Sequence, residues 1–276
     1  MPATRRLAWL AVASAVVVVL THFLRIFTPW GQRWDDDAYV EALQLPEDLQ
    51  ATCDALLSTL RIPSISALLV VCVVIAAYRR QVLTGLVLAC AFAAAVASAE
   101  VLAILIPRPD LAADLTALID NAGANTFPSG HATIAAALSL ALITVVAPRW
   151  RPWAAGFGLA FTLAVAGSTV IAGWHRPSDA VGGIALAAAW MSLAAWLLAR
   201  IRGVQAQGRS TQGYFVAGLA LGGLAIAVAV VLAAMTPGGF AVAFASAEAL
   251  IVLATLATVT SFALCLREID FPRHRR

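Results

Sequence analysis

The sequence predicts an all-α fold, a bundle of helices that crosses a membrane several times. Of its 276 residues, 62% are hydrophobic and only 12% are charged, whereas soluble domains have roughly 45–50% apolar and 25% charged residues. Its apolar stretches mostly approach the roughly 20 residues that a spanning helix needs. Composition and stretch length together predict an integral membrane protein.

Eight stretches along the chain have the length and apolarity of spanning helices. They lie at about residues 7–27, 62–78, 82–106, 130–147, 153–174, 179–199, 213–235 and 241–265. A Gly/Pro break at residues 237–239 leaves a re-entrant hairpin open as an alternative near the last pair. The polar segment 200–212 has the composition of a flexible connector, so we expect a six-helix core in residues 1–200 and a C-terminal transmembrane pair in residues 201–276.

The distribution of charge predicts the orientation in the membrane. Short loops rich in basic residues stay on the cytoplasmic side, and an alternating topology with the N-terminus inside places most arginines in cytoplasmic segments and most acidic residues outside. We therefore expect a multi-pass protein of the plasma membrane with cytoplasmic N- and C-termini. The sequence has no contiguous basic face with interleaved aromatic residues, so we expect no nucleic-acid partner.

The first external segment, about residues 28–61, is polar for this chain. It carries Trp30, Trp34 and the acidic run Asp35-Asp36-Asp37, and we expect a short amphipathic helix over residues 38–60 on the membrane surface. Three adjacent carboxylates can bind a divalent cation, but an acidic run is more often a solvated loop. We therefore interpret the run as a solvated loop that sets the topology.

Two short polar segments interrupt the apolar pattern, and the first is Phe127-Pro128-Ser129-Gly130-His131-Ala132-Thr133. Ser129 lies where a helix N-cap is expected, so the amides after it should be free of helical partners. Free amides at a helix start bind phosphate, and Gly130 allows close approach of an anion. His131 is placed to donate a proton to a leaving oxygen. The alternative interpretation is an ordinary capped helix.

The second polar segment is Gly173-Trp174-His175-Arg176-Pro177-Ser178-Asp179. His175 and Asp179 are four residues apart, which places both side chains on one helical face or across one turn. A carboxylate that holds one imidazole nitrogen leaves the other nitrogen free to attack phosphorus. The alternative is a histidine at the membrane interface beside an aspartate at a helix start.

Arg108 lies between two prolines at the end of the third apolar stretch. Its planar guanidinium suits phosphate oxygens, although one external arginine can also reach lipid head groups. Glu100 lies inside the same stretch, where it could pair with Arg108 or His131 or remain protonated and hydrogen-bonded. A cation, an anion-binding turn and two imidazoles at one membrane surface predict phosphate chemistry on a lipid.

Together these motifs resemble those of the type 2 phosphatidic acid phosphatase (PAP2) superfamily, whose soluble relatives include vanadium haloperoxidases. The resemblance covers about residues 60–200 and rests on Arg108-Pro109, Pro128-Ser129-Gly130-His131, and His175 with Asp179. It implies a six-helix phosphatase core that needs no metal and no other cofactor. It also implies residue roles: His175 as the nucleophile that forms a phosphohistidine, Asp179 as its partner, His131 as the general acid, and Arg108 with the region of Ser129 and Gly130 as the phosphate cradle.

The chain departs from the pattern of that family at two positions. Family members usually carry a lysine seven residues before the arginine, where this chain has Val101, and an arginine six residues before the nucleophile, where it has Thr169. Loss of one donor to a transition-state oxygen costs about 2.7–4 kcal/mol. Candidates that could bind phosphate instead are Arg176, Arg61 and Thr169 itself, with Ser168 as a further hydrogen-bond donor.

The resemblance implies a membrane phosphatase that hydrolyses a lipid phosphomonoester or a polyprenyl pyrophosphate whose head group lies in the outer leaflet. Phosphatidic acid, phosphatidylglycerol phosphate and polyprenyl pyrophosphate are candidate substrates that the sequence does not rank. The alternative is a non-catalytic or weakly active relative that binds or transports phosphorylated lipids. The expected partners are thus the phosphorylated lipid and the bilayer, and the sequence does not predict an oligomeric state.

Overall fold

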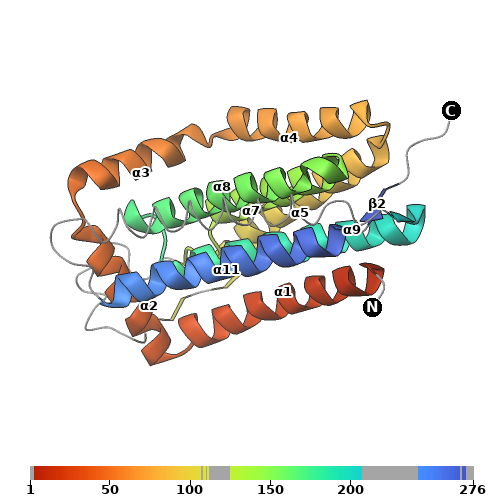
Figure 1. Cartoon of the computed structure of the whole chain (residues 1–276). Helices are drawn as coiled ribbons and strands as arrows, with labels where there is room; N and C mark the ends of the chain where they lie inside the picture. The colour runs from red at the N-terminus through yellow and green to blue at the C-terminus, as the bar shows by residue number, and fades with distance from the viewer. Residues whose placement is uncertain are drawn as a thin grey trace.

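The structure, a computed structural model, describes residues 3–106, 108–109, 111, 125–206, 242–267 and 269–271. These residues form long helices that lie side by side along one axis, with two shorter helices toward one end (Figure 1). In chain order the helices are α1 (Ala3–Ile26), α2 (Pro29–Leu43), α3 (Glu47–Thr59), α4 (Ile62–Tyr78), α5 (Val82–Leu105), α7 (Gly130–Val145), the 3-10 turn η1 (Pro148–Trp150), α8 (Arg151–Ile171), α9 (Pro177–Arg202) and α11 (Val242–Leu266). The predicted all-α membrane bundle is confirmed.

Most of these helices are long and apolar enough to cross a membrane. Among the described residues, α1, α5, α8 with its preceding turn, α9 and α11 meet that requirement singly. The α3–α4 pair meets it jointly, with a 60° bend at the break, and α7 is a shorter apolar helix of 16 residues. The chain is therefore a multi-pass membrane protein. The predicted span at 213–235 and the break at 237–239 lie outside the described residues.

Helix α9 lies among most of the other long helices and organises the bundle. It packs against α1, α5, α7 and α11, and much of its buried surface is alanine and glycine. The buried surface of α7 is also rich in alanine. Small residues let transmembrane helices approach closely. This packing brings the polar segments that precede α7 and α9 to the same end of the bundle.

The first external segment differs from its prediction. One helix was expected over residues 38–60, whereas the structure has α2 and α3 there. Thr28 caps α2 by accepting a hydrogen bond from the Gly31 amide, and Pro29 occupies the first turn; both features favour an early helix start. Pro46 then precedes the first turn of α3. The two helices lie against α8, and α2 also contacts α9 and α11.

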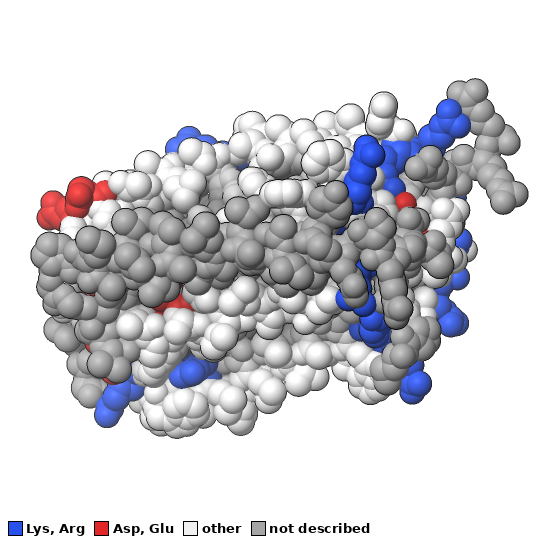
Figure 2. All heavy atoms as spheres, in the orientation of Figure 1, with Lys and Arg blue, Asp and Glu red and all other residues white. Residues whose placement is uncertain are grey.

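Charged side chains separate toward the two ends of the bundle. Most arginines visible in Figure 2 gather at the end where α1 begins, and the acidic cluster on that face lies toward α3. At the arginine-rich end, β1 (Gln205–Ala206) and β2 (Ile269–Asp270) form an antiparallel pair, with Gln205 opposite Asp270. The expected flexible connector at 200–212 is thus ordered as far as residue 206, and its remainder lies outside the described residues.

Candidate active site

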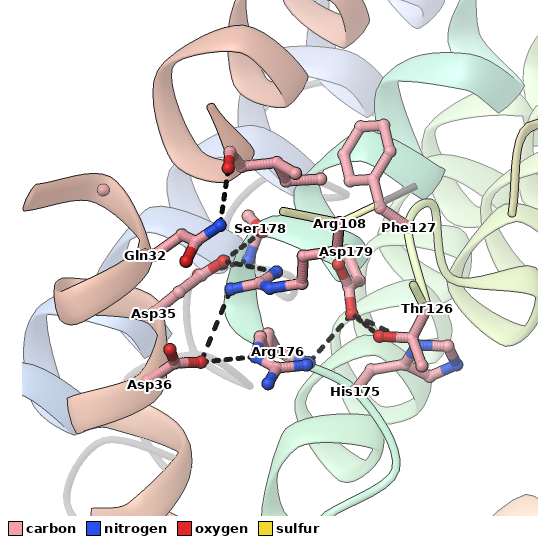
Figure 3. Close-up of polar contacts among 12 residues, drawn as sticks. Gln32, Asp35, Asp36, Arg108, Thr126, Phe127, His175, Arg176, Ser178 and Asp179 are labelled. Carbon is pink, nitrogen blue, oxygen red and sulfur yellow. Dashed lines mark hydrogen bonds and ion pairs between the residues drawn. The ribbon is translucent and has the colours of Figure 1, made fainter. Parts of the chain in front are cut away.

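The three polar segments of interest meet at the end of the bundle that holds α2. Arg108 follows α5, Ser129 caps α7, and His175 lies in the loop that joins α8 to α9. Arg108 and Asp179 are buried, while 15% of the His175 side chain is exposed. Figure 3 shows Arg108, His175 and Asp179 in one cluster. The structure thus brings together residues that are far apart in the sequence.

The start of α7 is tied to the start of α9. The Ser129 hydroxyl accepts a hydrogen bond from the Ala132 amide at 3.4 Å, so Ser129 is the N-cap, as predicted. The Ser129 amide itself donates to the backbone carbonyl of Asp179 at 2.9 Å. The capped turn before α7 and the aspartate beside His175 therefore lie next to one another.

Two glycines of α9 make this contact possible. A Cβ atom added at Gly183 would lie 2.5 Å from the carbonyl oxygen of Ser129, and one added at Gly182 would lie 2.2 Å from the buried ring of Phe127. Neither position has space for a larger residue unless the turn moves. Gly182 and Gly183 thus set the distance between the two polar segments, a role that the sequence alone did not indicate.

His175 and Asp179 face each other, as their spacing suggested. Nδ1 of His175 lies 3.5 Å from Oδ2 of Asp179. The same carboxylate oxygen accepts hydrogen bonds from the Thr126 hydroxyl at 2.5 Å and from the Arg176 amide at 3.0 Å. Because Nδ1 faces the carboxylate, Nε2 is the ring nitrogen that is left for a substrate.

The loop that carries His175 is fixed from two directions. The carbonyl of Thr169 accepts hydrogen bonds from the amides of Trp174 and His175, each at 3.0 Å. Tyr39 of α2 donates its hydroxyl to the carbonyl of Gly173 at 2.7 Å, and Gly173 has φ of 70°, a conformation that favours glycine. These contacts hold the backbone of the loop that carries His175.

Trp174 connects this loop to its surroundings on both sides. Its indole nitrogen donates to Asp54 of α3 at 3.0 Å. Its ring meets the ring of His131 edge-on, with 5.2 Å between the centroids. His131, the second residue of α7, therefore lies beside the loop that carries His175.

Asp35 and Asp36 of α2 point into the cluster and face its arginines (Figure 3). Both are completely buried. Asp36 Oδ1 lies 2.5 Å from Nε of Arg176 and 3.4 Å from Nη2 of Arg108, and Asp35 Oδ2 lies 3.8 Å from Nη1 of Arg108. The prediction of a solvated acidic loop is therefore wrong for these two residues, because α2 begins early and turns them toward the bundle.

Helix α2 also holds the backbone around the site. The Gln32 amide donates to the carbonyl of Pro109 at 2.5 Å. The Ser178 amide donates to Asp35 at 3.1 Å, and the Ser178 hydroxyl donates to the same carboxylate. Gln32, Asp35 and Asp36 have the i, i+3, i+4 spacing of one helical face. This spacing on one helical face, in a chain whose external arginines need counter-ions, is the feature of the sequence that could have identified these three residues as part of the site.

The charge of this cluster depends on Asp35. Its pKa is raised to about 7, first by burial and then by the negative charge of Asp179, against the opposing effects of Arg108 and Ser178. Within the described residues, Asp36 Oδ2 and Asp179 Oδ1 accept no hydrogen bond although both atoms are buried. Such unpaired atoms are rare in folded proteins, so the cluster can accept hydrogen bonds from a further donor.

The other predicted phosphate ligands differ in their positions. The Thr169 hydroxyl is buried and donates to the carbonyl of Ala166 at 2.7 Å. Val101, at the position where the resemblance implies a lysine, is 49% exposed on α5. Arg61 is exposed at the start of α4, where its Nε donates to the carbonyl of Ser58 at 3.0 Å.

Arg176 is the proposed substitute whose guanidinium lies in the cluster beside Arg108 (Figure 3).

Glu100 lies near the start of α7, because a Cβ atom added at Gly130 would be 3.4 Å from its Oε1. In the described part of the chain, Glu100 forms no ion pair with Arg108 or His131. The same part contains no group of three or more His, Cys, Asp or Glu side chains that could hold a metal ion.

Residues 83–202 match the family model of the PAP2 superfamily, and this part of the chain belongs to that superfamily. The match runs from α5 to the end of α9 and contains Arg108, His131, His175 and Asp179. No curated protein and no solved structure matches the chain. The buried carboxylates of α2 are therefore supplied to the matched segment by a part of the chain that lies outside the match.

Proposed function

We propose that this chain, whose residues 83–202 belong to the PAP2 superfamily, is a membrane-embedded phosphatase of lipid phosphates. Superfamily membership supports a phosphatase-type function, and the apolar helices support a membrane setting. The observation that carries the proposal is the contact of His175 Nδ1 with Asp179 at 3.5 Å, beside Arg108 and the capped start of α7. The substrate class is a lipid phosphomonoester or a polyprenyl pyrophosphate.

The proposed reaction has two steps on one imidazole. Nε2 of His175 attacks phosphorus, and the bond between phosphorus and the leaving oxygen breaks while His131 donates a proton to that oxygen. Asp179 stabilises the positive charge that develops on the His175 ring. Water then attacks the phosphohistidine, His131 takes a proton from that water, and orthophosphate leaves with His175 restored.

The proposed phosphate cradle combines the Arg108 guanidinium with backbone amides at the start of α7, after Ser129 and at Gly130. Arg176 supplies a second guanidinium, in place of the arginine that relatives usually carry at the position of Thr169. Thr169 contributes through its carbonyl, which positions His175, because its own hydroxyl is engaged elsewhere. No step in this scheme requires a metal ion.

Asp36 occupies the two guanidinium groups that a substrate phosphate would bind. Its carboxylate lies against both Arg108 and Arg176, so the phosphoryl oxygens of a substrate compete with it for the same guanidinium groups. This competition also supports a second candidate function, a weakly active or non-catalytic protein that binds or transports phosphorylated lipids. The two candidates differ in whether phosphate is released.

The deciding experiment measures orthophosphate release from phosphatidic acid, phosphatidylglycerol phosphate and a polyprenyl pyrophosphate by the purified chain in detergent. We expect release from at least one lipid, and a fall of roughly 10³-fold or more in His175→Ala, because the nucleophile is removed. Asp48→Ala, at an exposed position on α3, is the control and should retain activity. Equal background release by the wild type and by His175→Ala would favour the binding protein.

For the membrane topology, we propose that both termini are cytoplasmic, that the site faces outward, and that the protein resides in the plasma membrane. The separation of arginines and acidic residues between the two ends supports this orientation. The division into a catalytic core of residues 1–200 and a C-terminal transmembrane part of residues 201–276 also remains a proposal. Cysteine labelling of an exposed residue at each end, with intact cells and a membrane-impermeant reagent, tests the orientation.

A further inference from the structure

A cavity of about 380 Å³ opens at the end of the bundle opposite the candidate active site. It lies between the turn that joins α4 to α5 and the segment that joins α7 to α8, with Ile75 and Val146 in its apolar lining. Three arginines also line it: Arg79, Arg80 and Arg149. Ligand pockets have roughly 300–1,000 Å³. The size and the charge of this cavity suit a small anionic group attached to an apolar body.

Arg79 fixes the walls of the cavity. One of its guanidinium nitrogens donates to the carbonyls of Val145 and Val146, each at 2.8 Å. The other pairs with Asp270 of β2 at 2.5 Å. The turn after α4 and the end of α7 are thereby held together, and the hydrogen bonds of Arg79 are used within the protein.

Arg80 and Arg149 differ from Arg79 because both are exposed. In the described part of the chain, neither forms an ion pair. The Arg149 guanidinium lies over the ring of Trp150, 5.8 Å from its centroid, which restricts the side chain. Arg80 has φ of 59° and reverses the chain between α4 and α5. Two positive charges are thus available at the cavity.

The cavity lies at the depth of lipid head groups. Helix α4 ends at Tyr78 and α5 begins at Val82, so the turn between these two apolar helices lies at a membrane surface. Tyr78 and Trp150, which also line the cavity, are 90% and 54% exposed. Tyrosine and tryptophan are enriched where hydrocarbon meets water.

We propose that this cavity binds the head group of an anionic phospholipid. The lipid phosphate lies between the guanidinium groups of Arg80 and Arg149, and the glycerol and the first acyl carbons lie on the apolar lining. Basic pockets at the ends of transmembrane helices are suited to anionic head groups. The proposal does not depend on the phosphatase activity, since the cavity lies at the other end of the bundle.

The test uses the purified full chain in detergent, titrated with phosphatidylglycerol and separately with phosphatidylcholine. An arginine that contacts the anionic head group contributes about 1 kcal/mol, or roughly a fivefold gain in affinity. We therefore expect Arg80→Gln/Arg149→Gln to bind phosphatidylglycerol roughly 25-fold more weakly than the wild type. Arg200→Gln/Arg202→Gln, at the same end but outside the cavity, is the matched control and should bind as the wild type does. Phosphate release should be the same in all three proteins.

Three results would overturn the proposal. The first is unchanged phosphatidylglycerol binding by Arg80→Gln/Arg149→Gln. The second is equal weakening by the Arg200→Gln/Arg202→Gln control, which would indicate a general effect of surface charge. The third comes from a parallel titration with orthophosphate: if orthophosphate binds as tightly as the lipid, the ligand is a free anion rather than a head group.

Discussion

Both ends of the bundle bury arginine against aspartate, but the two clusters are built differently. At the end away from the candidate site, Asp270 pairs with Arg79 at 2.5 Å and with Arg151 at 3.0 Å. The two guanidinium groups also donate to backbone carbonyls, namely those of Val145, Val146, Leu266 and Ile269. This cluster ties β2 to the ends of α4, α7, α8 and α11, and its carboxylate oxygens are all used.

At the site, Arg176 lies 2.5 Å from Asp36, but the pairing of Arg108 is looser. Arg108 approaches Asp36 and Asp35 only at 3.4 and 3.8 Å, and one oxygen each of Asp36 and Asp179 is unpaired within the described residues. A buried charge whose contacts are long gains less from them than a closely paired one. The difference indicates that the Asp270 cluster is structural, whereas the Arg108 cluster is arranged so that a phosphate can replace existing contacts.

The largest expected effect comes from breaking the structural cluster. Asp270→Asn keeps the shape of the side chain but leaves Arg79 and Arg151 without their counter-ion. Breaking a buried pair costs roughly 3–5 kcal/mol, so we expect a clearly lower melting temperature in detergent. Asp48→Asn, an exposed acid on α3, should have no such effect. If Asp270→Asn also abolished the activity of the protein that remains folded, the two ends would not be independent.

The next effect concerns the distance between the two polar segments at the site. In Gly183→Ala, the new Cβ would lie 2.5 Å from the carbonyl of Ser129, so the start of α7 must move away from α9, the helix that carries Asp179. A displacement of about 1 Å at a reacting centre can cost roughly 100-fold in rate, and we expect kcat to fall by about that factor. Gly85→Ala, where the contact is 3.0 Å to Ala76 near the opposite end, is the matched control. Equal kinetic losses in both variants would contradict this account.

The smallest expected effect tests whether Asp36 competes with phosphate for Arg108 and Arg176. Asp36→Asn removes the carboxylate that competes for Arg108 and Arg176, so orthophosphate should inhibit turnover with an inhibition constant lowered about tenfold, or 1.4 kcal/mol. Asp37→Asn changes the neighbouring acid, which is not part of the cluster, and should leave the constant unchanged. Weaker inhibition in Asp36→Asn would mean that Asp36 positions the arginines for phosphate instead of competing with it.

Much of the fold could be predicted because helical transmembrane segments are specified locally. The apolar stretches correspond to α1, α4, α5, α7, α8, α9 and α11, and the position of Ser129 before an apolar run predicted its capping role. The spacing of His175 and Asp179 predicted that the two could face each other, because four residues make about one helical turn. These features depend on neighbours within a few residues, so the sequence displays them directly.

The partners of the arginines could not be read in the same way. Asp36 is 72 residues from Arg108 and 140 residues from Arg176, and the acidic run by itself looked like a solvated loop. The early start of α2 and its packing against α8, α9 and α11 decide that Asp35 and Asp36 are buried. A pairing across such separations depends on how whole helices pack.

The sequence by itself therefore determined a multi-span helical membrane protein with a PAP2-like set of histidine, aspartate and arginine residues. Only the tertiary structure decided that Asp35 and Asp36 are buried against the arginines, that Gly182 and Gly183 set the spacing of the two polar segments, and that Arg80 and Arg149 share one cavity. The physical reason is range: hydropathy and capping act within one or two helical turns, whereas counter-ions and close contacts between helices are fixed by the packing of the complete bundle.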